Sequence, residues 1–400
     1  MKAVGIVCEY NPFHLGHKRQ IDILRENGAE TVICAMSGNY TQRGELAIAD
    51  KYTRAKAAVE CGADVVIELP FPFSSLSAEG FARAGAYLLA SVGADTISFG
   101  SECADRELLK SAASAVASED FIAAYSSAQK DTGAAKAYFD TLHAIMGNDI
   151  ELLSNDILAV SYIAAINELK PDMDIFPIER KGGAYRSGDI GDRIPSASAI
   201  RRAVTEESNC FNMLDESHMP LPSLNVFKDA QIKGDAPVHI EKASREILSF
   251  FKLLIPTEIT ARAVLRSCGG QTVADDGCGI VERICNAARS SDSLSEMLTK
   301  SYNARYTDAR INRVLLFSLF GASDIWTKAL PQYTTILAAS ERGRRYLSDI
   351  RKSVDYTIIT KPADAPDGAL TTILKASDAF YAETMGKKSD NFIKMHPFMA

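Results

Sequence analysis

The chain has 400 residues, of which 46% are hydrophobic and 24% are charged, and its formal net charge is −7. It is long enough for two or three buried cores, and it contains no run of about 18 apolar residues that would cross a membrane. The acidic balance argues weakly against a nucleic-acid partner, although the average hides a local excess of basic residues.

The first seven residues and the eight cysteines bear on where the protein works. Residues 1–7 carry one charged side chain and a short apolar run, which predicts a first strand rather than a signal peptide. The cysteines are scattered, and none falls in a C-x-x-C pair or in a zinc-like spacing with histidine. We therefore expect a cytoplasmic protein with reduced cysteines in its core and no metal site built by the chain.

Short apolar runs alternate with helical patterns through the first hundred residues. Strands are predicted at residues 3–7, 31–36, 64–69 and 96–99, and helices at residues 17–26, 50–61 and 77–91. Successive apolar runs are about 30 residues apart, which is the spacing of βαβ units. The pattern predicts an α/β fold with a doubly wound, Rossmann-like parallel sheet, whose ligands bind at the carboxyl ends of the strands.

The pattern changes beyond residue 105. Residues 105–170 are predicted to be largely helical, residues 174–178 form a further strand, and a polar loop leads to a helix that opens at Ser196, a good N-cap. Three prolines interrupt the pattern between residues 209 and 237. Helical patterns dominate from about residue 240, with a strand or two expected within residues 354–374. We expect an α/β domain over residues 1–205 and a mainly helical domain over residues 206–400.

Residues 5–17 carry an apolar strand into a turn that places a His-x-Gly-His motif, residues 14–17, at a helix start. The amino end of a helix exposes unpaired N–H groups and the positive end of the helix dipole, so it attracts phosphate. Gly16 lets phosphates approach the backbone, and the two imidazoles can donate hydrogen bonds to a phosphoryl group without a metal. The alternative is a buried structural pair of histidines. The motif is that of the nucleotidyltransferase superfamily, and it predicts an ATP site.

Several segments besides this turn match one family. They are residues 36–45 (MSGNYTQRGE), 64–70 (DVVIELP), 98–102 (SFGSE), 154–158 (SNDIL) and 196–201 (SASAIR), with looser agreement over 304–313 and 342–344. Together they resemble the bacterial tRNA(Met) cytidine acetate ligases, most densely up to about residue 202. Leu15 stands where the family often has a polar residue, and Ser198 stands where threonine is common. Neither change removes a phosphate ligand.

The resemblance implies an HUP-type nucleotidyltransferase domain and a two-step reaction. Such enzymes use ATP, with Mg²⁺, to convert acetate into acetyl-adenylate and pyrophosphate. They then pass the acetyl group to N4 of the wobble cytidine (C34) of elongator tRNA(Met), which yields N4-acetylcytidine and AMP. The implied partners are this tRNA and acetate, with no stable protein partner and no membrane. Because the carboxylate is the nucleophile, the chain has to position the reactants and stabilise charge at the α-phosphate.

Carried over by motif, the resemblance places ATP along the turn and at three positions further on. The predicted nucleotide contacts are Ile6, Val7, Cys8, Glu9, Tyr10, Asn11, Pro12, Phe13, His14, Leu15, Gly16, His17, Lys18, Arg19, Gln20, Gly100, Asn155 and Arg180. The predicted catalytic residues are His14, His17 and Arg201, with Arg201 clamping the β- and γ-phosphates. Without the resemblance, Gly100 would only end a strand, Asn155 would be a helix N-cap, and the arginines would be surface charges.

A local excess of positive charge lies in the second half of the acidic chain. Residues 300–352 hold ten basic and four acidic side chains. Such a segment is either a footprint for nucleic-acid phosphates or a solvated helix face. The predicted tRNA contacts are Arg305, Arg310, Arg313, Arg342, Arg344 and Arg345.

Two other functions stay open from the residues alone. One is an adenylyltransferase that acts on a small phosphate or carboxylate metabolite, although such enzymes need little beyond the sheet domain and this chain adds about 200 residues. The other is a non-catalytic nucleotide-binding protein, which the complete set of motif residues disfavours. Residues 42–45 are interpreted as a mobile substrate loop rather than a structural turn. Glu9 and Glu68 are carboxylates at strand ends that could hold Mg²⁺ indirectly or cap a helix, and neither is assigned a role.

Overall fold

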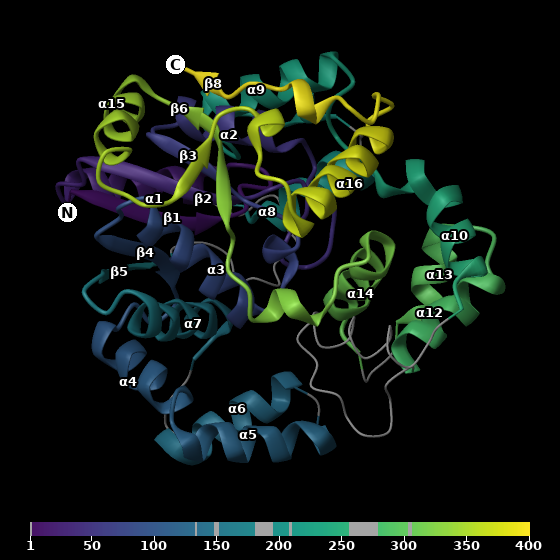
Figure 1. Ribbon diagram of the computed structural model, residues 1–400, viewed down its shortest axis with the longest axis horizontal. Helices are drawn as coiled ribbons and strands as arrows, with labels where there is room; N and C mark the ends of the chain where they lie inside the picture. Colours follow the sequence, from purple (N-terminus) through teal and green to yellow (C-terminus); the bar gives the residue numbers. More distant parts are fainter. Residues whose placement is uncertain are drawn as a thin grey trace.

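The computed structural model describes residues 2–132, 134–147, 152–180, 195–207, 210–255, 279–302 and 306–400 (Figure 1). Eight strands of this part of the chain form one sheet, in the order β5-β4-β1-β2-β3-β6-β7, with β8 beside β6. The strands are β1 Ala3–Cys8, β2 Thr31–Ser37, β3 Val65–Leu69, β4 Thr96–Ser101, β5 Asp174–Glu179, β6 Tyr333–Ala339, β7 Thr357–Ile359 and β8 Phe398–Met399. The first five are mutually parallel, as predicted, whereas β6 runs antiparallel to β3.

Helices connect and cover the strands. They are α1 Leu15–Glu26, α2 Lys51–Glu60, α3 Ala78–Ser91, α4 Arg106–Val116, α5 Glu119–Thr132, α6 Ala134–Met146, α7 Ser154–Leu169, α8 Ala197–Arg202, α9 Leu221–Ile232, α10 Ser244–Leu253, α12 Gly279–Arg289, α13 Leu294–Ser301, α14 Asp308–Phe320, α15 Glu341–Ile350 and α16 Ala369–Thr384. The chain moves across the sheet from β1 to β2 and β3, and then crosses back through α3 to β4, on the other side of β1. Right-handed crossovers therefore put α3 on the face opposite α1 and α2.

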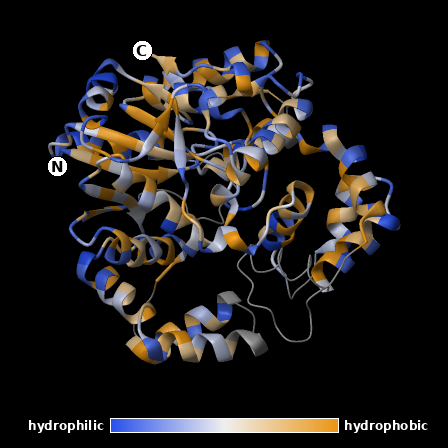
Figure 2. Cartoon of the chain, viewed as in Figure 1, coloured by the Kyte–Doolittle hydropathy of each residue, from blue (hydrophilic) through white to orange (hydrophobic). Residues whose placement is uncertain are grey.

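The central strands are buried on both faces. A parallel sheet covered by helices on both sides reads as continuous apolar runs, and Figure 2 shows these runs along the sheet. Gly5 of β1 shows how tightly α3 packs, because a Cβ at this position would lie 2.6 Å from the Leu89 side chain. Among the described helices, none combines the length and apolarity that crossing a bilayer requires.

The second half of the chain returns to the sheet. Strand β6 pairs with β3, and Thr334 of β6 donates a hydrogen bond to the Glu68 carbonyl at 2.7 Å. The strand expected within residues 354–374 is present as β7, but β6 and β8 were not predicted. A buried apolar run of seven residues has no periodicity that separates a strand from a helix. The division at residue 205 stays a prediction, and the sheet is built from both sides of it.

Two helical groups extend away from the sheet (Figure 1). Helices α5 and α6 pack against each other, as do α10, α12 and α13. The prediction of largely helical residues 105–170 and 240 onward is confirmed for these elements. The carboxyl ends of β1, β4 and β5, which carry most of the predicted nucleotide contacts, lie in the body of the molecule.

Candidate nucleotide site

The His-x-Gly-His turn is fixed by hydrogen bonds from its own backbone. His14 is the N-cap of α1, and its Nδ1 accepts the Gly16 N–H at 3.0 Å. The Nδ1 of His17 accepts the His14 N–H at 3.2 Å, and the two ring centroids are 3.9 Å apart. Because an Nδ1 that accepts a backbone N–H carries no proton, each neutral ring has its proton on Nε2. Both histidines are therefore hydrogen-bond donors through Nε2.

The surroundings keep both rings neutral. Burial, with the charges of Arg180 and Arg201, lowers the pKa of His14 to about 3. Burial, with His14 and Arg180, lowers the pKa of His17 well below its usual range. Near neutral pH the two imidazoles can therefore donate to a phosphate without carrying a charge.

Helix α8 places Arg201 beside this turn. Ser196 caps α8 by accepting the Ala199 N–H, so the helix begins where the sequence predicts. Arg201 Nη1 donates to the carbonyl of Asn11 at 2.8 Å, and Nη2 lies 3.9 Å from a carboxylate oxygen of Glu45. The structure thus brings together His14, His17 and Arg201, although 184 positions separate the last two (201 − 17).

The three downstream contacts meet at a second point, around Glu102. The Glu102 carboxylate accepts the side-chain amide of Asn155, and it accepts the Asn155 and Asp156 N–H groups at 3.1 Å. Arg180 Nε lies 3.8 Å from the same carboxylate, and the Arg180 side chain covers Gly100, where a Cβ would be 3.2 Å from Arg180 Cγ. Asn155 is therefore not the N-cap of α7; it is the second residue of that helix.

Asp156 closes the same junction from the other side. It is buried, and it accepts hydrogen bonds from Ser101 Oγ at 2.5 Å and from the N–H groups of Glu102, Cys103 and Leu153. Burial alone would raise the pKa of Asp156, but these hydrogen bonds outweigh it and lower the pKa. The carboxyl end of β4 and the amino end of α7 are thus locked together.

The other predicted contacts in residues 6–20 divide into three groups. Six of them are buried and support the turn from the protein interior: Ile6, Cys8, Tyr10, Asn11, Pro12 and Phe13. Lys18 pairs with Asp22, Arg19 donates to the Glu179 carbonyl at 2.8 Å, and Gln20 donates to Ser98 Oγ at 3.3 Å. Val7, Glu9, Leu15 and Gly16 are partly exposed.

Sequence reasoning missed Arg54, which has no exposed surface. Its guanidinium donates to the carbonyls of Glu9, Ser37, Gly38 and Ala49. The Glu9 carbonyl follows β1, and those of Ser37 and Gly38 lie at the end of β2, so one side chain fixes the carboxyl ends of both strands. The only signal in the sequence was an arginine on an alanine-rich helix.

The loop after β2 is tied to the second half of the chain. Tyr40 Oη donates to the Ser377 carbonyl at 2.6 Å, Arg313 Nη1 donates to the Gln42 carbonyl at 3.2 Å, and a Cβ at Gly44 would meet the backbone of Arg313 at 2.5 Å. The interpretation of residues 42–45 as a mobile substrate loop does not follow from these contacts. Helices α14 and α16 hold the loop instead.

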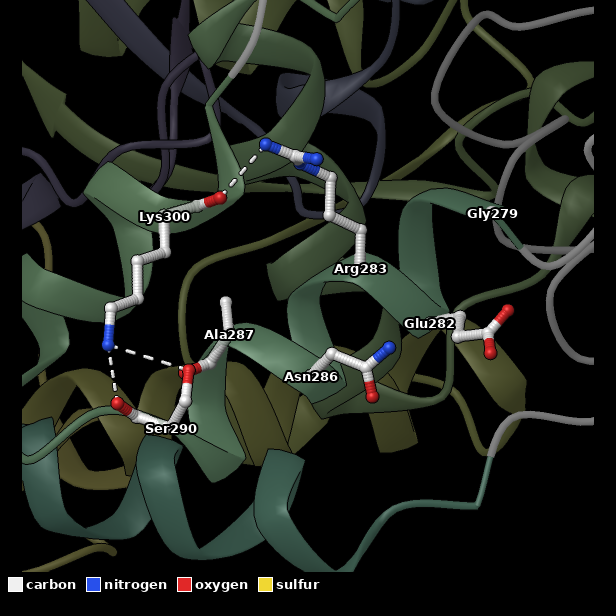
Figure 3. Close-up of a pocket in the computed structure, with 7 residues that line it drawn as sticks. All are labelled: Gly279, Glu282, Arg283, Asn286, Ala287, Ser290 and Lys300. Atoms are coloured by element: carbon white, nitrogen blue, oxygen red, sulfur yellow. Dashed lines mark hydrogen bonds between the residues drawn. The ribbon is translucent and has the colours of Figure 1, made fainter.

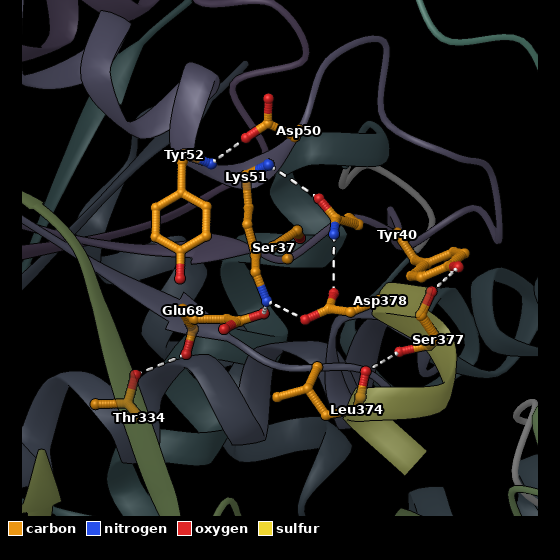
Figure 4. Close-up of polar contacts among 12 residues, drawn as sticks. Ser37, Tyr40, Asp50, Lys51, Tyr52, Glu68, Thr334, Leu374, Ser377 and Asp378 are labelled. Atoms are coloured by element: carbon orange, nitrogen blue, oxygen red, sulfur yellow. Dashed lines mark hydrogen bonds and ion pairs between the residues drawn. The ribbon is translucent and has the colours of Figure 1, made fainter. Parts of the chain in front are cut away.

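A buried charge cluster anchors the same loop (Figure 4). Lys51, which is 1% exposed, lies 2.7 Å from carboxylate oxygens of both Glu68 and Asp378, and Asn39 donates to Asp378 at 2.8 Å. Burial favours a neutral Lys51, but the two carboxylates reverse this effect and raise its pKa. Burial also raises the pKa of Glu68. Glu68 therefore has a structural partner, which the sequence alone did not reveal.

The predicted RNA contacts do not form one surface. Arg305 lies outside the described residues. Arg313 is buried beside Gln42, at the carboxyl ends of the parallel strands, and Arg310 lies one turn away on α14. Arg342, Arg344 and Arg345 lie on α15, where Arg342 donates to the Glu30 carbonyl just before β2 begins. The two groups therefore lie at opposite ends of the strands, because α15 follows β6 and β6 runs antiparallel to β3. Arg310 and Arg313 lie at the carboxyl ends of the parallel strands, called the nucleotide edge of the sheet, and the arginines of α15 lie at the other edge.

A cavity of about 420 Å³ lies between α12 and α13, away from the turn (Figure 3). Its basic side chains are engaged within the helices: Arg283 donates to the Lys300 carbonyl at 3.0 Å, and Lys300 donates to the Ser290 carbonyl. Among the described residues, no three histidines, cysteines or carboxylates gather as a metal site.

The parallel sheet, with a His-x-Gly-His turn at the start of α1, defines a protein of the nucleotidyltransferase class. A family model described as HIGH Nucleotidyl Transferase matches residues 1–393. The tRNA(Met) cytidine acetate ligase of Acetivibrio thermocellus is 32% identical over 91% of this chain and 89% of its own length, and that of Listeria monocytogenes is 32% identical over 98% and 97%.

Two solved structures of Thermotoga maritima TmcAL superpose on the whole chain. The apo form has a TM-score of 0.87 at 28% identity, and a form bound with alpha-thio ATP has a TM-score of 0.85 at 27% identity, each covering 100% of this chain and 99% of the other. The chain belongs to the HIGH nucleotidyl transferase family and, within it, to the tRNA(Met) cytidine acetate ligases.

Proposed function

We propose that this protein is an ATP-dependent ligase that activates acetate as acetyl-adenylate and transfers the acetyl group to N4 of the wobble cytidine of elongator tRNA(Met). The observation that carries the proposal is the meeting of His14, His17 and Arg201 at one helix start in a chain that belongs to this ligase family. A tRNA substrate would place the enzyme in the cytoplasm.

In the first step, acetate attacks the α-phosphate and pyrophosphate leaves. The Nε2 donors of His14 and His17 would meet the negative charge that develops on the phosphates, and the forked guanidinium of Arg201 would hold the β- and γ-phosphates. Magnesium, bound with ATP, would neutralise part of the phosphate charge. Binding of ATP would then require Arg201 to loosen its long contact with Glu45.

The adenosine would lie at the junction of β4, α7 and β5. Gly100 offers bare backbone there, beneath the Arg180 side chain, while Glu102 orients Asn155 and the amino end of α7. This junction and the turn follow neighbouring parallel strands, β4 and β1, so one extended nucleotide can span both.

In the second step, the tRNA presents its cytidine to the adenylate. We propose phosphate contacts on both basic groups, Arg310 near the nucleotide edge and Arg344 and Arg345 on the exposed face of α15. A bound tRNA would then extend around the sheet rather than cover a single basic stripe.

Acetate-dependent exchange between ATP and pyrophosphate tests the first step, and mass analysis of nucleosides from elongator tRNA(Met) tests the second. We expect exchange without tRNA and N4-acetylcytidine with it. Exchange supported by a small phosphorylated metabolite but not by acetate would favour the adenylyltransferase. Tight ATP binding with no exchange, whether acetate or a small phosphorylated metabolite is added, would favour a non-catalytic nucleotide-binding protein.

A further inference from the structure

Transfer of an acetyl group to an amine releases a proton, and the site has to accept it. On the proposed function, the N4 lone pair of cytidine attacks the carbonyl carbon of acetyl-adenylate. A C–N bond forms, the bond from that carbon to the adenylate oxygen breaks, and AMP leaves with the electron pair. N4 loses one proton in this step. An exocyclic amine conjugated with a pyrimidine ring is a weak nucleophile, so a base that removes the proton during attack accelerates the step.

The two histidines cannot serve as this base. Each Nδ1 is occupied by a backbone N–H, from Gly16 for His14 and from His14 for His17. Each Nε2 carries the remaining ring proton, so neither ring has a free lone pair. Taking up a proton would require breaking the bonds that shape the turn.

Other polar groups of the site are less suited to accept the proton, because they already have hydrogen-bond or ion-pair partners or cannot accept a hydrogen bond. Arg201 is a donor only. Glu102 accepts three hydrogen bonds from the first residues of α7. Glu45 lies 3.9 Å from Arg201, a contact that ATP binding would loosen, so Glu45 is the alternative proton acceptor that a variant has to exclude. Tyr10 is buried against Cys34, at 3.4 Å.

Glu9 is different. It is the first residue after β1, it is partly exposed, and its Oε1 accepts the Gln42 N–H at 2.7 Å. Its Oε2 receives no hydrogen bond from the described residues. The backbone on either side is fixed, because Arg54 donates to the Glu9 carbonyl at 2.5 Å and Arg201 donates to that of Asn11. A carboxylate with one free oxygen is thus held at the edge of the phosphate turn.

We propose that Glu9 is the general base that accepts the N4 proton of cytidine during acetyl transfer. Burial, opposed by the hydrogen bond from Gln42, raises the pKa of Glu9 above that of an ordinary carboxyl, which makes its ionised form a stronger base. The charged and titratable groups that act on it from the packed elements are Arg201 of α8, Glu45 of the β2 loop, Arg54 of α2 and Tyr162 of α7.

The test separates activation from transfer in Glu9→Gln, where the amide oxygen can still accept the Gln42 N–H. Two acceptors are compared, tRNA and hydroxylamine, which attacks acyl phosphates without a base. Per adenylate formed, we expect acetylation of tRNA to fall by about 100-fold or more and acetohydroxamate formation to stay within about 3-fold of the wild type. A parallel loss with both acceptors, or no loss with tRNA, would overturn the inference.

Glu45→Gln is the matched control, since it neutralises the neighbouring carboxylate. In Glu45→Gln, the amounts of acetylated tRNA and of acetohydroxamate per adenylate formed should stay as in the wild type. If this variant lost only tRNA acetylation, Glu45 rather than Glu9 would be the base that accepts the proton. In single-turnover reactions, the transfer rate of the wild type should rise with pH as Glu9 ionises, and Glu9→Gln should abolish that rise. Absence of adenylate in the wild-type protein would overturn the proposed function and, with it, this inference.

Discussion

His17 combines two roles at the scale of one side chain: its Nδ1 holds the turn and its Nε2 donates to the phosphate. The variant His17→Asn keeps an acceptor at the Nδ1 position and removes the Nε2 donor. We expect adenylate formation to slow by about 100-fold or more, the usual effect of losing one preorganised donor. Single-turnover rates measure this, with ATP affinity from calorimetry.

Arg201→Ala should slow the same step and also weaken ATP binding, because the β- and γ-phosphates are charged before reaction.

The control for His17 is His17→Gln, which offers a donor near the Nε2 position but no acceptor at Nδ1. It should retain more turnover than His17→Asn. The opposite order would mean that the turn, and not the donor, carries the effect.

The neutral state of His14 predicts a pH dependence of stability. Its pKa is about 3 in the folded protein and about 6.5 in an unfolded chain. Between these values the unfolded state binds a proton that the folded state does not, so the free energy of unfolding falls as pH decreases below about 6.5. His14→Asn, which can still accept the Gly16 N–H, should lose less stability between pH 7 and pH 5 than the wild type. Urea midpoints at both pH values measure this, and equal losses would contradict it.

At the scale of elements, the junction of β4 with α7 depends on one buried carboxylate. Asp156→Asn removes the charge that accepts four hydrogen bonds, and we expect a loss of about 1–3 kcal/mol of unfolding free energy together with weaker ATP binding. Urea unfolding and calorimetry measure the two effects. Asp105→Asn is the control, because Asp105 is an exposed N-cap of α4 and asparagine caps equally well. Similar losses in both variants would show that the junction has no special role.

The elements also explain which loops are fixed. The loop after β2 lies between α14 and α16, so its position depends on residues more than 270 positions away, as the contact between Gln42 and Arg313 shows (313 − 42 = 271). The interpretation as a mobile loop was based on local composition alone, which contains no information about such partners.

At the scale of the whole molecule, the basic residues are divided between two edges of the sheet. Arg344→Glu and Arg345→Glu, on the exposed face of α15, should each weaken tRNA binding. The slope of the logarithm of the binding constant against the logarithm of the salt concentration should become shallower by about one, because about one counterion fewer is released. Adenylate formation should stay unchanged. Filter binding over a range of salt concentrations measures the slope. Lys233→Glu makes a similar charge change after α9 and should have a smaller effect. Unchanged binding in both arginine variants would restrict the RNA to the nucleotide edge.

The sequence by itself determined the βαβ order of the first five strands, the His-x-Gly-His turn and the helix start at Ser196. These features depend on hydrophobic periodicity and on capping residues within a few positions of one another. Only the tertiary structure decided the insertion of β6 beside β3, the role of Arg54 and the pairing of Lys51 with Glu68 and Asp378. It also separated Arg313 from Arg344, which the local charge excess had grouped together. Such contacts join segments far apart in the chain, and their energy comes from burial and pairing that no local window of sequence contains.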